Sequence, residues 1–349
     1  MKVNYLIVGQ GLAGSLIAWH LLKRNQRILV VDQDEAVTSS KVAAGLVTPL
    51  AGSRFSIPEG LSERLDYAHQ FYWEIEEKLK EPFFHHTRIT RIFRNEKEQQ
   101  AWKKREANKD QAFDRLCGPA TIDPERFSAP YGGFEMKHGG WMNVPSFLEV
   151  TRQHLLERTA YAIGALKSDD VKISREGIQW KNIEADGIIF AQGWRGSDNR
   201  FFDWLPMKSA AGDILDLSIP ELKDESRIIN SGGWLLPIGG GRFRAGSTYR
   251  HDFSDLSPSA QGRDEVIKKL AGFTQADIEV TGHRSAIRPI IQRSQVFIGR
   301  HPSESRVAFF NGLGSKGVIN GPWHAERLAA HLLEDVAIPE KCDIRSNFE

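Results

Sequence analysis

Apolar residues along the chain follow two kinds of pattern, one typical of strands and one typical of helices. Short apolar runs at residues 3–8 and 27–31 predict two buried strands, and the apolar positions between them, at 14–24, recur at helical spacing. A turn containing Gly9, Gly11 and Gly14 separates the first strand from the helix. Strand, glycine turn, helix and strand in this order predict a βαβ unit of a parallel sheet. The glycines, Gln10 and His20 interrupt Tyr5–Leu22, so we expect neither a signal peptide nor a membrane span there.

Two later segments predict a different architecture. Apolar residues at helical spacing predict an amphipathic helix over 61–79. Residues 207–250 instead alternate with a period of two and contain the triplet Gly239–Gly241, which predicts a hairpin in a mostly antiparallel sheet. The chain therefore reads as an α/β protein with a Rossmann-like part and a largely antiparallel part.

Composition narrows the possible partners. The 349 residues include 46 Lys+Arg and 45 Asp+Glu, so the formal charge is only +1. A protein without a net positive field is a poor binder of nucleic acid, and we expect no such partner. The two cysteines, Cys117 and Cys342, are far apart and have no cysteine or histidine cluster beside them. They predict neither a disulfide framework nor a zinc site, and they favour a reducing cytoplasm.

The glycine turn has the spacing of a dinucleotide-binding motif. In Gly9-x-Gly11-x-x-Gly14 the glycines allow a tight turn, a close approach to a diphosphate and close packing of helix on strand. Asp32 ends the second strand, where a carboxylate can accept hydrogen bonds from ribose hydroxyls. The residues of this unit predicted to contact a dinucleotide are Gly9, Gly11, Leu12, Ala13, Gly14, Asp32 and Gln33.

The segment after this unit indicates which dinucleotide is bound. Residues 38–49 are small, hydroxyl-bearing and apolar, and with the preceding motifs their pattern TSS-x-x-AAG-x-x-x-P resembles the FAD-dependent D-amino-acid oxidase, glycine oxidase and sarcosine oxidase family. Further ordered similarities lie at 139–145, 186–194, 296–302 and 311–317. The resemblance implies FAD, in a Rossmann-like domain of the glutathione-reductase type interleaved with an antiparallel substrate domain. It assigns 1–80, 141–206 and 284–349 to the first domain, and 81–140 and 207–283 to the second.

The resemblance also implies the remaining cofactor contacts. A helix that begins between Gly317 and Pro322 would direct its positive end at the N1–C2=O edge of the flavin, and Lys316 either adds to that field or is an exposed loop residue. Sarcosine oxidase holds its flavin through a cysteine near the position of Arg288, and because this chain has none there we expect non-covalent FAD. The further predicted contacts are Ser39, Ser40, Ala43, Ala44, Gly45, Leu46, Ala191, Gly193, Trp194, Gly312, Gly314, Ser315, Lys316, Gly317 and Val318.

Substrate recognition is predicted at Arg288. In glycine and D-amino-acid oxidases the arginine of the matching Arg-Pro pair holds the substrate carboxylate, and a guanidinium binds a carboxylate with two parallel hydrogen bonds. Arg284 lies four residues earlier and, on a strand, faces the same way. Tyr249 and Trp234 are further candidates for the pocket wall. Adjacent His85 and His86 are expected to be structural and to bind no metal, since neighbouring strand residues face opposite ways.

These features predict oxidation of the C–N bond of a small amine or amino acid. Hydride would pass from the α-carbon to flavin N5, the imine would hydrolyse, and dioxygen is the expected oxidant, with a quinone or another electron acceptor as the alternative. No catalytic base is predicted. Residues 284–288 and 313–317 also resemble the FAD domain of a bifunctional tRNA wobble-uridine modifying enzyme, which is a second hypothesis. A third is a flavin-binding subunit of a multi-subunit amine dehydrogenase.

Overall fold

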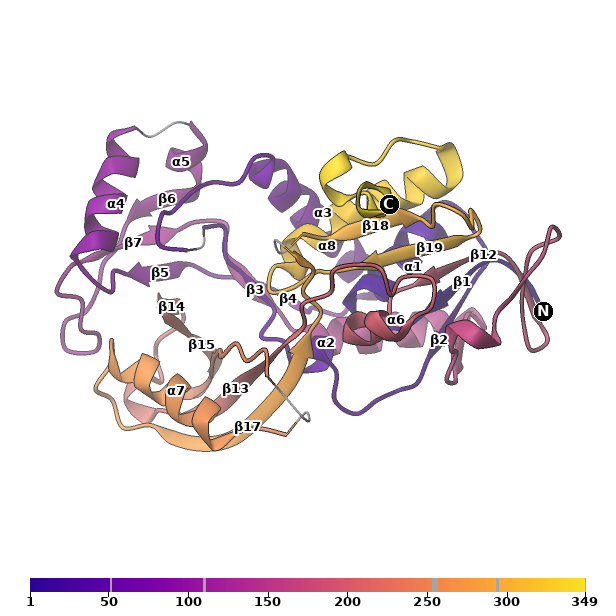
Figure 1. Cartoon of the computed structure of the whole chain (residues 1–349). Helices are drawn as coiled ribbons and strands as arrows, with labels where there is room; N and C mark the ends of the chain where they lie inside the picture. The colour runs from indigo at the N-terminus through magenta and orange to yellow at the C-terminus, as the bar shows by residue number, and fades with distance from the viewer. Residues whose placement is uncertain (51, 109–110, 253–256, 293–294, 349) are drawn as a thin grey trace.

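The chain folds into two lobes, each built on one large sheet (Figure 1). The computed structural model describes residues 1–50, 52–108, 111–252, 257–292 and 295–348. Each large sheet has eight strands, and a third sheet of three strands joins segments from both regions of the chain. No helix among the described residues is long and apolar enough to cross a bilayer.

The first lobe contains the predicted βαβ unit. Its sheet is parallel at the centre, where β1 pairs with β2 on one side and with β12 on the other, and β12 also pairs with β19. The apolar runs at 3–8 and 27–31 are these buried central strands. The strands of this sheet are β1 (Lys2–Val8), β2 (Ile28–Asp32), β9 (Tyr161–Ile163), β10 (Lys172–Ile173), β11 (Ile178–Trp180), β12 (Ile183–Phe190), β18 (Phe297–Arg300) and β19 (Val307–Asn311).

Helices from distant parts of the chain pack together in this lobe. Helix α8 packs on both α1 and α3, and the helix predicted over 61–79 is confirmed as α3. The buried face of α3 includes Leu65, Ala68 and Tyr72, and the Tyr72 hydroxyl donates to Val318 O in α8 at 3.0 Å. The helices are α1 (Leu12–Lys23), α2 (Ser39–Val42), α3 (Leu61–Leu79), α6 (Val144–Glu157) and α8 (Gly317–Glu334).

The second lobe holds the predicted antiparallel sheet. Its strand order is β17-β13-β16-β15-β14-β5-β7-β6, and the predicted hairpin is the antiparallel pair β15 and β16. Gly239, Gly240 and Gly241 all have positive φ at its turn, which explains the glycine triplet. The strands are β5 (Ile89–Ile92), β6 (Cys117–Pro119), β7 (Gly133–Met136), β13 (Ala210–Ser218), β14 (Ile228–Ser231), β15 (Gly233–Gly239), β16 (Arg242–Gly246) and β17 (Glu279–Arg288).

Three helices accompany the second sheet, and a small sheet lies between the lobes. Helix α7 packs against β13 and β15, while α4 and α5 lie at the opposite end near β6 and β7 (Figure 1). The helices are α4 (Glu96–Ala107), α5 (Gln111–Leu116) and α7 (Ala260–Ala271). The small sheet, in the order β3-β8-β4, consists of β3 (Leu46–Val47), β8 (Gly140–Met142) and β4 (Phe84–His86).

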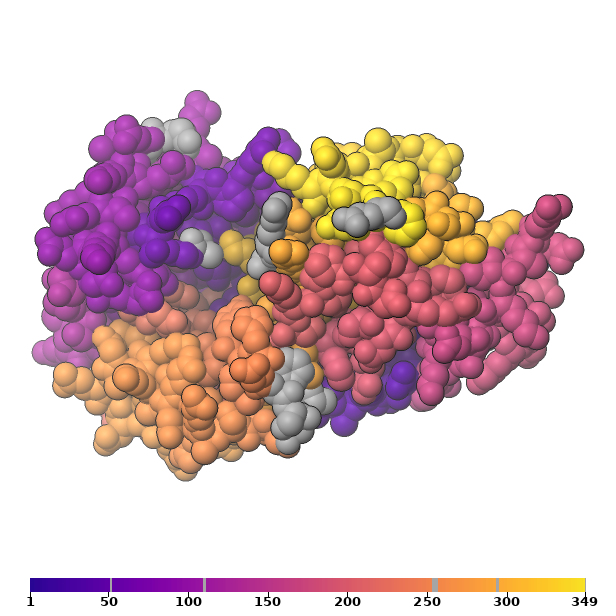
Figure 2. Space-filling view, viewed as in Figure 1, coloured from indigo at the N-terminus to yellow at the C-terminus, as the bar shows by residue number. Residues whose placement is uncertain are grey.

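The two lobes are built from alternating segments of the chain. In Figure 2 the left lobe combines purple and orange segments, while the right lobe combines red and yellow ones. Strand β17 runs past the domain limit predicted at residue 283 and ends at Arg288. We therefore propose that the second domain extends to residue 288, with the other predicted limits unchanged.

Candidate active site

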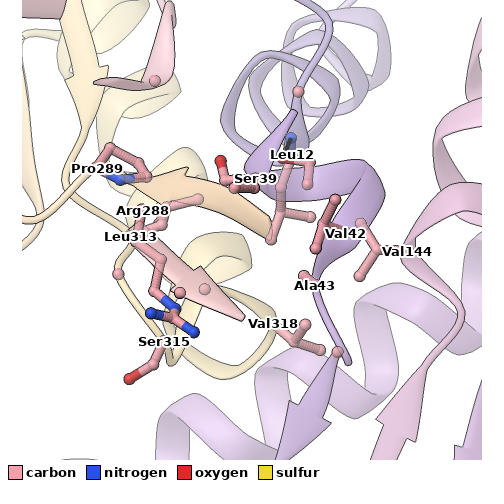
Figure 3. A pocket seen from close by; sticks show the side chains of 18 of the residues that line it. Leu12, Ser39, Val42, Ala43, Val144, Arg288, Pro289, Leu313, Ser315 and Val318 are labelled. Carbon is pink, nitrogen blue, oxygen red and sulfur yellow. Dashed lines mark hydrogen bonds between the residues drawn. The ribbon is translucent and has the colours of Figure 1, made fainter. Parts of the chain in front are cut away.

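A cavity of about 500 Å³ lies between the lobes. Residues of the first βαβ unit and of α2 form one side of it, and residues of β17 and of the loop before α8 form another (Figure 3). The labelled side chains of Leu12, Ser39, Val42 and Ala43 lie across from Arg288, Pro289 and Leu313. The cavity thus brings the predicted cofactor motifs and the predicted substrate residue to one place.

The glycine turn is shaped as the motif requires. Gly9 has φ +99°, and a Cβ on Gly14 would overlap the carbonyl oxygen of Gly9, so only glycine lets α1 pack this closely on the turn. Gly11 caps α1 without a side-chain hydrogen bond, and the first turn of α1 carries no acidic residue. The amide of Leu12, the first of this turn, donates to Ser40 Oγ, and the amides that follow it have no intrahelical acceptor and are suited to a diphosphate.

Asp32 lies at the cavity wall where β2 ends. Its Oδ2 accepts from the amide of Gln10 at 2.6 Å and its Oδ1 accepts from the amide of Asp34 at 2.8 Å. These two bonds hold the carboxylate beside the glycine turn and leave lone pairs on both oxygens for ribose hydroxyls. The turn, the uncapped helix and the acid together fit an adenine dinucleotide.

The segment after β2 forms a close-fitting wall. The hydroxyl of Ser40 accepts from the amide of Leu12 at 3.0 Å and so ties α2 to the start of α1. Gly45 has φ +68°, and a Cβ there would overlap Met142 O of β8. Small residues in this segment therefore allow backbone to run along the cavity, as predicted for a flat ring and a ribityl chain.

The loop before α8 supplies a second uncapped helix end at the cavity. Helix α8 begins after Lys316 without a side-chain cap and with no acid in its first turn. Asn311 holds the loop, since its Nδ2 donates to Gly193 O at 2.6 Å and its Oδ1 accepts from the amide of Gly312 at 2.9 Å. Burial lowers the pKa of Lys316, and this side chain lines the cavity rather than lying free in solvent. Helix end and ammonium together create a positive region suited to the N1–C2=O edge of a flavin.

Arg288 is the cation of the opposite wall. Its guanidinium lies 4.4 Å from the centre of the Tyr249 ring, and its Nη1 donates to Thr248 O at 3.0 Å. A Cβ on Gly212 would overlap the guanidinium, so the glycine of β13 leaves the space in which this side chain lies. Burial lowers the pKa of Arg288, and no carboxylate is bonded to it among the described residues. The site can therefore accept an anionic group.

Arg284 does not reach the cavity. Its Nη2 donates to Asp216 Oδ1 at 2.7 Å, and Arg244 lies beside the same carboxylate at 3.6 Å. The sequence predicts that Arg284 and Arg288 face the same side of one strand. Asp216 of the neighbouring strand β13, however, forms an ion pair with Arg284. The predicted clamp is left to Arg288 alone.

Most predicted site residues line the cavity, with three exceptions. Gly14 lies behind the glycine turn and Gly312 supports the loop with φ +83°, while Arg284 is ion-paired. The predicted residues that line the cavity are Gly9, Gly11, Leu12, Ala13, Asp32, Gln33, Ser39, Ser40, Ala43, Ala44, Gly45, Leu46, Ala191, Gly193, Trp194, Trp234, Tyr249, Arg288, Gly314, Ser315, Lys316, Gly317 and Val318.

Several cavity residues were not predicted. Arg195 pairs with Glu35 at 2.6 Å near the dinucleotide end, and Arg91, Asn230 and Lys269 lie on the side of the second sheet. None belongs to a motif with recognisable spacing, so no local signal in the sequence identifies them. Their shared position depends on the pairing of strands that are far apart in the chain.

The cavity wall carries few groups that could act as a base. Among the described lining residues the only carboxylates are Asp32, at the end of β2, and Glu35, just after it, and no histidine is present. His85 stacks on Trp141 at 4.3 Å between ring centroids, whereas His86 lies 4.8 Å from His69. The arrangement supplies cations and close-fitting backbone on the substrate side rather than an acid–base pair.

Comparison with known proteins decides the family. A family described as FAD dependent oxidoreductase (DAO) matches residues 4–331. The chain belongs to this FAD-dependent oxidoreductase family. FAD is accordingly its cofactor, and the two uncapped helix ends and Asp32 are the features of the cavity that fit it.

The relatives include amino acid oxidases. Glycine oxidase of Pseudomonas putida is 24% identical over 92% of this chain and 92% of its own length. The tRNA 5-methylaminomethyl-2-thiouridine biosynthesis bifunctional protein MnmC of Idiomarina loihiensis is 23% identical over 93% of this chain but only 55% of its own length. The solved structure of glycine oxidase from Geobacillus kaustophilus has the same fold, with a TM-score of 0.80, 17% identity and coverage of 97% and 96% of the two chains.

Proposed function

We propose that this family member oxidises the C–N bond of an amine that carries a carboxylate, such as an amino acid or an N-substituted glycine. The observation that carries the proposal is the Arg288 guanidinium, which lines the cavity, faces the cofactor segments and has no carboxylate partner among the described residues. The similarity to glycine oxidase supports the same substrate class.

The residues of the chain bind and orient, and the cofactor performs the oxidation. FAD, when bound, supplies the acceptor for the hydride that leaves the carbon next to nitrogen. Arg288 would hold the carboxylate of the substrate. The Tyr249 ring stacks on the guanidinium and covers one of its faces, which limits how a carboxylate can approach it. Loss of the hydride and of the amine proton turns the C–N bond into C=N, and water then releases a carbonyl compound and ammonia or an amine.

No acid or histidine lies on the substrate side among the described residues that line the cavity, and we expect this to give the reaction a pH dependence. With no group there to take the proton from an ammonium, the substrate has to enter as the neutral amine. We expect the rate of flavin reduction to rise with pH until the substrate amine is deprotonated. Dioxygen is the proposed oxidant of the reduced enzyme, with hydrogen peroxide as product.

Replacing Arg288 by leucine tests the proposal. The holoenzyme should be yellow, lose its absorbance near 450 nm anaerobically with a carboxylated amine, and release peroxide in air; peroxide formation separates an oxidase from a dehydrogenase that needs a quinone. A lost guanidinium–carboxylate pair costs roughly 2–3 kcal/mol, so R288L should raise the KM at least tenfold. R288K should recover part of this affinity. An unchanged KM in R288L would reject the carboxylate clamp, and no bleaching with any amine would reject the reaction.

A second candidate function is oxidation of a group on modified tRNA, which the similarity to MnmC favours. The formal charge of +1 is against it, because tRNA binding depends on neutralising phosphates. A gel-shift assay with total tRNA at low and at moderate salt separates the two functions. Retarded tRNA whose binding weakens steeply with salt would favour the tRNA substrate, and no retardation at low salt would exclude it.

A further inference from the structure

The cavity extends along the face of the second sheet across six neighbouring strands. One cross-strand row joins Ile214, Gly246, Trp234, Asn230 and Arg91, each directly opposite the next. Residues directly opposite each other lie on the same face, and all five line the cavity. Ala286 and Arg288 of β17 complete the lining at the other edge. The floor of the cavity therefore runs from β17 to β5.

This floor is long compared with a small amino acid. Five strand spacings of about 4.8 Å separate the backbones of β17 and β5, on the order of 24 Å along the sheet. Gly212 and Gly246 have no side chain that would rise from the floor into the cavity. The Arg288 side chain lies over Gly212, and a Cβ on Gly246 would come 2.7 Å from the Trp234 ring. A substrate the size of glycine would occupy only the part of this floor next to Arg288.

A second guanidinium lies at the far end of the floor. Arg91 of β5 is only 11% exposed and lines the cavity. Its Nη1 donates to Asn230 Oδ1, and its Nη2 lies 3.2 Å and 3.3 Å from the two carboxylate oxygens of Glu98. Its Nε is buried and has no acceptor among the described residues.

The charge of Arg91 is only partly compensated. Glu98, itself 2% exposed, is shared with Arg94, whose Nε donates to Glu98 Oε1 at 2.7 Å. One carboxylate therefore faces two guanidinium groups, of which Arg94 is 47% exposed and solvated while Arg91 is largely buried. The buried Nε of Arg91 is the donor left without a partner among the described residues, which is costly unless a ligand supplies an acceptor. Lys269, the other cation on this side, donates to Ser247 O at 2.8 Å and to Glu265 at 2.6 Å, so its charge is paired.

We propose that the substrate is an elongated amine with two acidic groups, one held by Arg288 beside the cofactor and a second held by Arg91 at the far end of the floor. The proposal rests on the proposed amine oxidation and specifies its substrate class. We take the distal group to be anionic because Arg91 is a cation that offers only donors, and its buried Nε has no acceptor among the described residues. The apolar stretch between the two cations, which includes Ile214 and Trp234, suits the alkyl chain that would link the two groups.

The test is a series of N-substituted glycines used with the FAD-loaded enzyme. N-methylglycine is compared with N-(ω-carboxyalkyl)glycines of increasing chain length and with their ω-carboxamides, which match them in size but lack the distal charge. We expect one of the longer carboxylates to exceed both N-methylglycine and its own carboxamide in kcat/KM by roughly tenfold to a hundredfold, the range of a charge-assisted pair. R91Q should abolish the preference for the carboxylate over its carboxamide, measured as the ratio of their kcat/KM values within the variant.

Arg94 supplies the matched control. R94Q removes the other partner of Glu98, and Arg94 does not line the cavity. This variant leaves Glu98 to Arg91 alone but keeps the guanidinium with its unpaired Nε, so it should weaken the preference for the distal carboxylate less than R91Q does. Binding is measured separately by calorimetry with thioether analogues, in which sulfur replaces the amine nitrogen and oxidation does not occur. Their Kd values should show the same dependence on Arg91.

The outcomes distinguish the two proposals. If N-methylglycine and the longer carboxylates all bleach the flavin but carboxylate and carboxamide react equally in wild type, the distal site is rejected while amine oxidation stands. An equal loss of preference in R94Q and R91Q would assign the effect to the packing of Glu98 and also overturn the proposal. If no member of the series bleaches the flavin, the proposed reaction itself fails, and the calorimetric Kd ratio still decides whether Arg91 binds a carboxylate.

Discussion

At the scale of single residues, glycines determine where the functional side chains of this cavity lie. Gly14 allows α1 to pack on the glycine turn, and Gly212 allows the Arg288 guanidinium to lie against β13. The two cases differ in what a methyl group would meet. At Gly14 it would meet backbone, whereas at Gly212 it would meet the end of a flexible side chain. Substitution at Gly212 should therefore disturb binding more than folding.

Gly212→Ala is expected to displace Arg288 without unfolding the sheet. The added methyl group overlaps the guanidinium, which would turn away and lose its hydrogen bond to Thr248 O. The KM for carboxylated amines should rise about tenfold, the equivalent of 1.4 kcal/mol, and the Tm should change little. Gly118→Ala in β6 is the control, since Gly118 does not line the cavity and its methyl group would meet only the flexible side chain of Lys137, 3.0 Å from Cε. A KM for G212A equal to that of G118A would contradict the positioning role of Gly212.

Some functional residues of the cavity can be predicted from the sequence alone, and others cannot. Residues inside contiguous motifs, such as Gly9, Asp32 and Lys316, were predicted because their roles depend on neighbours within the same turn or strand end. Arg284 was grouped with Arg288 because spacing fixes only the face of a strand, whereas its partner Asp216 comes from β13. Arg91 carries no motif, and its place in the cavity depends on the register of β5 with β14.

At the scale of elements, the packing of α3 against the small sheet places a half-buried histidine between them. The His69 ring lies 4.8 Å from that of His86 and 5.2 Å from that of Phe84, both in β4. Its Nε2 is buried without a partner among the described residues. Burial, with the nearby His86 and His138, lowers the pKa of His69 to about 4.

This histidine should make folding stability depend on pH. The folded-state pKa lies below the ordinary value of 6.5, so between pH 6.5 and about 4 the unfolded chain binds the proton and the folded chain does not. The free energy of unfolding therefore falls as the pH falls through this window, and the loss from His69 levels off below it. H69L should flatten the urea-measured stability profile between pH 7 and 4. The exposed residue His251 gives the control H251L, and an identical slope in H69L and wild type would refute the assignment.

At the scale of the whole molecule, the two lobes share one cavity, and the bound cofactor should therefore stabilise both. Removing FAD by dialysis against concentrated bromide should lower the Tm and leave a protein that regains it with added FAD. At a free FAD concentration a hundred times the Kd, the gain is about 2.7 kcal/mol. The same treatment should release all flavin, because Cys117 and Cys342 are both buried and neither lines the cavity.

Riboflavin is the informative control for this experiment. It lacks the diphosphate and adenosine that the glycine turn, the start of α1 and Asp32 are shaped to hold. We expect it to restore little of the lost thermal stability. Equal recovery with riboflavin and FAD would mean that the dinucleotide end of the cavity contributes nothing to binding.

The architecture as a whole is predictable from the sequence, whereas the end of β17 is not. The spacing of apolar residues and the glycines in the turns predict the βαβ unit and the hairpin, and both are confirmed. The continuation of β17 to Arg288 had no such marker, because the residues after 283 are equally compatible with either lobe. Only pairing with β13, which comes from some seventy positions earlier in the chain, places them in the second sheet.

The strand order of the first sheet also governs how the protein is made. β1 pairs with β2 early, but its other neighbour is β12, β12 pairs with β19, and α1 packs on α8. The first part of the chain to leave the ribosome therefore waits for several of its neighbours until the end of synthesis. At roughly 5–20 residues per second, the start of α8 follows β1 by on the order of 15 to 60 s. During that interval the nascent glycine turn has no completed cavity around it. We therefore expect the complete cofactor site to form only after most of the chain has been translated, and a chain truncated before β19 should bind FAD more weakly.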